Sequence, residues 1–137
     1  MLSSLLQAAR ARTLSHIEAL SGDQWLGPQL DIVNPPLWEI GHVGWFQEYW
    51  CLRYREDGTS VPSMLENADV LYNSATVAHD SRWGLPLPSV EATKAYLRQV
   101  LNDVLERVDR EGADSHLVYF VQLAVFHEFM HNEAFHY

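Results

Sequence analysis

The final stretch of the sequence, FHEFMHNEAFHY, carries two histidines four residues apart, His127 and His131. On an α-helix, residues at this spacing lie one turn apart on the same face, so their imidazole rings can converge on a single ion. Imidazole nitrogen is a ligand that zinc, iron, copper and nickel all accept. The spacing therefore predicts part of a metal site and leaves the identity of the metal open.

The same letters spell H-E-x-x-H, the pattern of zinc proteases in which the glutamate is the general base. On a helix, Glu128 is rotated by about 100° from His127 and points away from the ion. Zinc proteases usually find their third ligand downstream, whereas this sequence ends at Tyr137, and His136 falls roughly on the opposite side of the helix. A protease is therefore not expected, and two core histidines that bind no metal stay an open alternative.

A third ligand is expected upstream, because two imidazoles alone make a weak site. The stretch NPPLWEIGHVGWFQEYW predicts a helix on which Trp38, His42, Trp45 and Tyr49 share one face. This aromatic face is predicted to point inward, where it packs the core or walls a pocket. His42 is therefore the candidate for the third ligand.

The depth of each histidine in its helix tests this choice. At 1.5 Å per residue, His42 lies about 12 Å from the start of its helix, and His131 and His127 lie about 9 and 15 Å from the end of theirs. The three rings share one level if the two helices run antiparallel. Parallel helices would leave the rings apart by a turn or more. The site therefore predicts the relative direction of two helices that are distant in sequence.

The elements that must position these histidines are four predicted helices, over residues 4–20, 34–55, 89–112 and 114–137. Strand patterns are nearly absent, so the fold class is all-α, a four-helix bundle. The predicted start signals are, in chain order, a Ser4–Gln7 capping box, Asn34 as the N-cap before Pro35, Ser89, and Asp114 or Ser115. Gly112 is the predicted end of the third helix.

Residues 56–88 form a connection that is long for a helix bundle, and connections of this length are often functional. A short helix is predicted within SMLENADVLYNS, where Ser63 and Glu66 have the spacing of a capping box. The connection is long enough to return along the bundle, which makes the second and third helices parallel. The predicted order, up-down-down-up, then places the second and fourth helices antiparallel, as the histidines require.

The length favours a single domain over residues 1–137. The net charge is −9, from 18 acidic and 9 basic residues. Such a balance argues against binding to nucleic acid or to anionic membranes. The single cysteine, Cys51, cannot form an internal disulfide, and neither a signal peptide nor a membrane-spanning run is visible. We therefore expect a soluble, cytoplasmic protein.

Taken together, NPPLWEIGHVGWFQEYW and HEFMHNE resemble the DinB-like iron-binding domain of the sulfoxide synthases of ergothioneine biosynthesis, and in particular their selenoneine-synthase branch. The stretch LYNSATVAHDSRWGLPLPS resembles the family's loop between the second and third helices, so the likeness covers nearly the whole chain. The resemblance implies an up-down-down-up bundle that holds non-haem iron, Fe(II), through His42, His127 and His131. Zinc or nickel could take the same ligands in the isolated protein.

The resemblance also implies a reaction, in which iron(II) and oxygen join a thiol or selenol donor to the imidazole of trimethylhistidine (hercynine). A glutamine that helps to bind substrate in the family is replaced here by Met130, and only Arg82 is available in place of the family's loop arginines. Met130 and Arg82 are therefore the expected substrate contacts in this chain.

Enzymes of this family carry a second domain, similar to the sulfatase-modifying factor, that supplies much of the substrate pocket and the catalytic tyrosine. This chain has no room for such a domain, and its last predicted helix stops at AFHY without a glycine cap. We therefore expect the first domain of a longer enzyme, or a truncated product of one, that is inactive by itself.

Two other functions stay open: a stand-alone DinB-like metal-dependent thiol transferase or hydrolase, and a metal-free bundle used for homodimerisation. If a metal is bound, its affinity is expected to fall below about pH 6, because ligation needs neutral imidazole. The candidates to orient the ligand rings are Glu48, Glu128 and Glu133. Three further histidines are expected at the surface: His16, His79 and His116.

Overall fold

The structure is a computed structural model that describes residues 2–30, 33–112 and 114–135. These residues form helices and no strand, with one isolated bridge between Tyr54 and Ser60. The all-α prediction is confirmed. Within the described ranges, no helix combines the length and the apolarity needed to cross a membrane. The helices are α1 Leu2–Ile17, η1 Gly22–Trp25, α2 Pro36–Glu48, η2 Tyr49–Arg53, α3 Ala68–Tyr72, η3 His79–Trp83, α4 Val90–Glu111 and α5 Ser115–Ala134.

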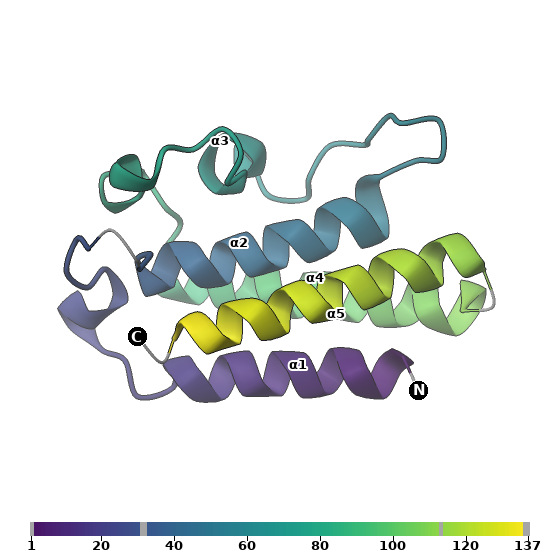
Figure 1. Ribbon diagram of the computed structural model, residues 1–137, viewed down its shortest axis with the longest axis horizontal. Coiled ribbons are helices and arrows are strands. Elements are labelled where there is room, and N and C mark those ends of the chain that lie inside the picture. The colour runs from purple at the N-terminus through teal and green to yellow at the C-terminus, as the bar shows by residue number, and fades with distance from the viewer. Residues whose placement is uncertain (1, 31–32, 113, 136–137) are drawn as a thin grey trace.

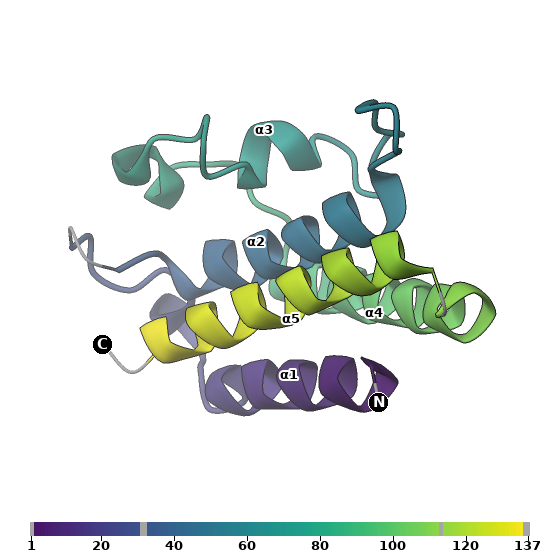
Figure 2. The same cartoon turned by 45° about the vertical axis from the view of Figure 1, so that its right-hand side comes forward.

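The four long helices form a bundle in which α2 and α4 run in one direction and α1 and α5 in the other (Figure 1). Residues 54–89, the crossover, lead from the end of η2 back along the outer side of α2 to the start of α4 (Figures 1 and 2). The crossover carries α3 and η3. The predicted up-down-down-up order is confirmed, and α5 lies antiparallel to α2.

The ends of the last two long helices follow the predicted signals. The Ser89 side chain accepts a hydrogen bond from the backbone N–H of Ala92 at the start of α4, and Gly112 is the C-cap of this helix. The Asp114 carboxylate accepts from the backbone N–H groups of His116 and Leu117 at the start of α5. These side chains satisfy backbone donors that have no partner inside the helix.

The predicted start signals of the first two long helices are wrong. Helix α1 begins at Leu2, so Ser4 lies inside its first turn and caps nothing. Helix α2 has Pro35 as its N-cap, and the side chain of Asn34 accepts a hydrogen bond from Arg82 of the crossover instead. The side chain that was predicted to cap α2 is therefore bound to a residue distant in sequence.

The short helix of the crossover also starts later than predicted. Ser63 forms no capping box with Glu66: its hydroxyl donates to the Glu48 carboxylate at 2.5 Å and accepts from the backbone N–H of Leu65 at 3.0 Å. The backbone N–H of Met64 donates to the other oxygen of Glu48 at 2.8 Å. A buried carboxylate needs such donors, since burial without partners costs several kcal/mol. Helix α3 begins only at Ala68.

A buried arginine on α1 contacts the other three long helices. The Arg10 guanidinium of α1 is 3% exposed and donates to the Glu128 carboxylate of α5 at 3.1 Å. It also donates to the Leu97 carbonyl of α4 at 2.6 Å and to the Gln47 amide oxygen of α2 at 2.7 Å. The Thr13 hydroxyl donates to the same Glu128 oxygen at 2.6 Å. This polar network fixes how the helices are rotated against one another.

Replacing Glu128 by alanine is expected to lower the free energy of unfolding by about 3 kcal/mol or more, because the Arg10 charge would stay buried without its partner. Glu133 lies on the same helix but is exposed, so Glu133→Ala is the matched control and should change stability by less than about 0.5 kcal/mol. Urea denaturation of both variants measures the difference. Equal stabilities would show that the ion pair does not hold α1 against α5.

Candidate metal centre

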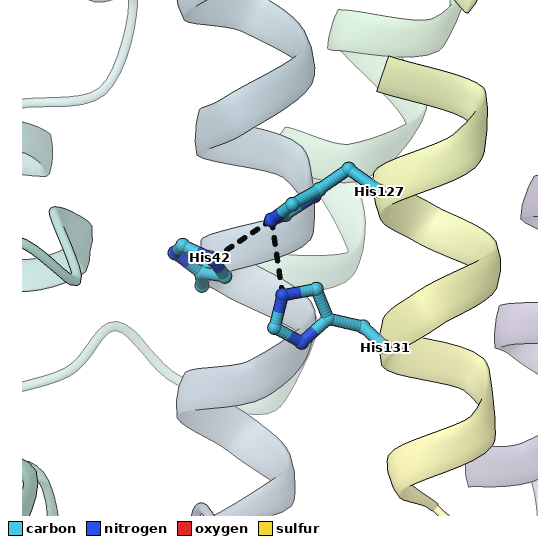
Figure 3. Close-up of side chains that lie close together, drawn as sticks. All are labelled: His42, His127 and His131. Carbon is cyan, nitrogen blue, oxygen red and sulfur yellow. Dashed lines mark hydrogen bonds between the residues drawn. The ribbon is translucent and has the colours of Figure 1, made fainter. Parts of the chain in front are cut away.

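Three histidine side chains meet between α2 and α5 (Figure 3). The Nε2 atom of His127 lies 3.1 Å from Nε2 of His42 and 3.0 Å from Nε2 of His131. Two nitrogens that bind one ion at right angles, each at about 2.1 Å, are about 3.0 Å apart. The three histidines, called the triad below, are therefore spaced as ligands of a single ion.

The antiparallel course of α2 and α5 brings the triad to one level, as the depth of each residue in its helix predicted. His42 lies in the middle of α2, and His127 and His131 lie one turn apart near the end of α5. The sequence predicted that His136 lies on the opposite side of this helix, but His136 is outside the described residues. The other three histidines are half-buried and make contacts away from the triad: His16 stacks on Phe135, His79 bonds to the Val33 carbonyl, and His116 packs against Phe120.

A backbone carbonyl of the crossover orients the His42 ring. Nδ1 of His42 lies 2.7 Å from the carbonyl oxygen of Tyr72, the last residue of α3. A carbonyl only accepts, so Nδ1 carries the proton and Nε2 presents its lone pair to the centre. The ring also stacks on Trp38, with centroids 4.8 Å and planes 8° apart. Both contacts fix His42 in the orientation that ligation requires.

A carboxylate orients His131 in the same way. Nδ1 of His131 lies 2.5 Å from a Glu39 oxygen, and Glu39 is almost fully buried. Glu39 stands three residues before His42, so helical spacing places both residues on the same face of α2, but the pairing with His131 forms only where α5 packs against α2. The partners that were predicted are wrong: Glu48 binds the crossover, Glu128 binds Arg10, and Glu133 is exposed.

The His127 ring is held by stacking. It lies flat on Phe46 of α2, with centroids 3.6 Å and planes 7° apart. Phe46 also lines a cavity of about 500 Å³ together with Trp45, Tyr49 and Trp50. The aromatic face of α2 therefore does both things that the sequence allowed, because Trp38 packs in the core and Trp45 walls a pocket.

Burial keeps two of the rings neutral. Loss of water, together with the smaller effect of the nearby His131 ring, lowers the pKa of His42 to about 4 and that of His127 to about 2. Neutral imidazole is the form that binds metal, so these two ligands stay available well below pH 6. The donor set of three nitrogens, two of them on rings held by a carbonyl and a carboxylate, fits a divalent transition metal.

The two expected substrate contacts lie near the triad in different settings. Met130 directly precedes His131 and is 54% exposed. The Arg82 guanidinium is buried, lies 4.0 Å from the ring centre of Trp38, and donates to Asn34 and to the carbonyl of Val77. Arg82 therefore links Asn34, which precedes α2, to Val77 of the crossover, next to Trp38.

The chain matches the DinB superfamily over residues 5–134 and belongs to that superfamily. It is similar to two proteins named hercynine oxygenase. The relative from Mycolicibacterium smegmatis is 31% identical over 135 residues, or 97% of this chain. The relative from Mycobacterium tuberculosis is 31% identical over 131 residues, or 94% of this chain. The matches span 30% of the length of each relative.

In the metal-free protein, stability is expected to fall as the pH drops from 6.5 towards about 4. The unfolded chain binds protons on His42 and His127 near pH 6.5, whereas the folded chain binds them only near about 4 and about 2. The unfolded state therefore holds more protons in this window, so acid favours unfolding. Thermal unfolding between pH 7 and pH 4.5 measures the effect. The midpoint should fall less steeply for His42→Gln or His127→Gln, and equal slopes would contradict the assignment.

Proposed function

We propose that this chain is the non-haem iron-binding domain of an oxygen-dependent enzyme that joins a thiol or selenol donor to trimethylhistidine (hercynine). The convergence of three oriented imidazole Nε2 atoms on one point carries the proposal. The name of both relatives, hercynine oxygenase, supports hercynine as a substrate. The selenoneine-synthase branch is supported by the sequence motifs alone.

Iron(II) is the proposed ion, with zinc or nickel as substitutes in isolated protein, because histidine ligands accept all three. Bound iron would supply the one-electron chemistry that dioxygen requires. The triad would bind the ion from one side and leave the other side open to substrates. The Glu39 carboxylate, through His131, would balance part of the charge of the ion and hold that ring in orientation.

Substrate recognition by this chain is proposed for Met130 and Arg82. Met130 lies exposed beside His131 and could contact a substrate on the open side of the ion. Arg82 already donates to Asn34 and Val77, so a substrate carboxylate would have to replace one of these partners. The cavity beside Phe46 offers further space next to His127.

A second domain is proposed to complete the pocket, since the relatives are about three times as long as the matched region. Helix α5 presents large apolar side chains to solvent beside the triad, with Phe126 65% and Met130 54% exposed. Exposed apolar patches of this kind often mark contact surfaces. We propose that a domain similar to the sulfatase-modifying factor covers this face in a cytoplasmic enzyme; a second copy of the chain is the alternative.

Protein prepared without an affinity tag and loaded anaerobically with iron(II) is expected to bind one ion per chain. His42→Ala should weaken binding by more than the 10- to 100-fold typical of losing an outer partner, because a direct ligand is lost. His79 lies outside the triad, so His79→Ala is the matched control. Metal analysis and competition titration measure both. A parent protein that binds no metal would favour the metal-free dimerisation module.

The isolated chain is expected to form no C–S or C–Se product from trimethylhistidine and a thiol or selenol donor with iron(II) and oxygen. The matched region spans only 30% of the length of each relative, and the proposed second domain would supply the rest of the pocket. Mass spectrometry of the reaction mixture tests this. Efficient product formation would refute the need for a second domain, whereas thiol transfer or hydrolysis without oxygen would favour the stand-alone alternative.

A further inference from the structure

We propose that Gly41 and Tyr72 are positioning residues for the metal ligand His42, and that they act through the crossover helix α3. This inference rests on the metal site proposed above. The residues in question touch neither the ion nor a substrate. They decide where the carbonyl that orients His42 lies, so they should control metal affinity from outside the ligand set.

Three ring N–H groups of α2 donate to α3. The indole of Trp38 donates to the Leu71 carbonyl at 2.7 Å, and His42 donates to the Tyr72 carbonyl at 2.7 Å. The indole of Trp45 donates to the carboxylate of Asp69 at 2.7 Å. Carbonyls at the end of a helix lack partners within it and carry partial negative charge, so they are suitable acceptors. The crossover is therefore attached to α2 at the residues that surround and include the ligand.

The attachment of α3 is reinforced on both sides. The Arg53 guanidinium binds both oxygens of Asp69 at 2.8 Å, near the start of α3. Beyond the end of α3, Arg82 lies over the Trp38 ring and donates to the Val77 carbonyl. With both flanks of α3 held in this way, the Tyr72 carbonyl has a defined position relative to α2.

Gly41 sets the distance between α3 and α2. A Cβ atom at this position would lie 2.3 Å from Cε1, 2.4 Å from Cζ and 2.6 Å from Oη of Tyr72. These separations are far below van der Waals contact, so one partner must move. The Tyr72 side chain is completely buried, with a relative exposure of 0%. A methyl group on residue 41 would therefore displace α3 and carry the Tyr72 carbonyl away from Nδ1 of His42.

The decisive comparison is Gly41→Ala against Gly44→Ala. Both variants add one methyl group to α2, but a Cβ on Gly44 would meet Leu97 and Tyr96 of α4, at 2.7 and 3.2 Å, away from the crossover. Competition titration with cobalt(II) should show a 10- to 100-fold loss of affinity for Gly41→Ala, the usual effect of losing an outer partner. The visible absorption of bound cobalt(II) should also change. Gly44→Ala should keep the affinity and spectrum of the parent, even where it lowers thermal stability.

Parent-like affinity and spectrum in Gly41→Ala would overturn the inference, and so would an equal loss in Gly44→Ala. Circular dichroism shows whether each variant folds. A second measurement needs no variant: nitrogen-15 NMR of the metal-free parent should find His42 protonated on Nδ1. Protonation on Nε2 instead would refute the role of the Tyr72 carbonyl. A parent that binds no metal but has the Nδ1 proton would contradict the proposed function and leave the positioning contact intact.

Discussion

The buried guanidinium of Arg10 is the contact on which the arrangement of the bundle depends. From α1 it donates to Gln47 of α2, Leu97 of α4 and Glu128 of α5. A buried cation is tolerated only when it is paired and its donors are satisfied. A slide or rotation of any one helix would leave a donor without its partner. The network therefore selects one register from the several that apolar packing alone would allow.

That register decides where the ligands point. Glu128 directly follows His127, so turning the carboxylate towards Arg10 turns the histidines of α5 towards α2. The same contact explains why the H-E-x-x-H letters form no protease site. The glutamate that a protease would use as a base is buried against α1, where Arg10 and Thr13 bind it. Glu128 therefore stabilises helix packing, whereas Glu39 orients His131 in the candidate site.

Each ligand ring is oriented by a different device. His42 donates to a carbonyl of the crossover, His131 contacts a carboxylate of α2, and His127 lies on the ring of Phe46. The long crossover is therefore more than a connection between parallel helices, because its short helix reaches the candidate metal centre. Burial of the same rings keeps His42 and His127 neutral, which is the state that a metal ion needs.

Much of this could be predicted from the sequence alone: the all-α class, the helix order and the set of His42, His127 and His131. These features follow from local periodicity, from helical rise and from the length of the crossover, which are properties of the chain itself. The groups that orient the histidines could not be predicted, because Glu39 and the Tyr72 carbonyl reach them only when α2, α3 and α5 pack together. The misplaced caps have the same cause. Residues such as Asn34 have side chains that can cap a helix, but in the folded protein these side chains form hydrogen bonds with residues distant in sequence instead.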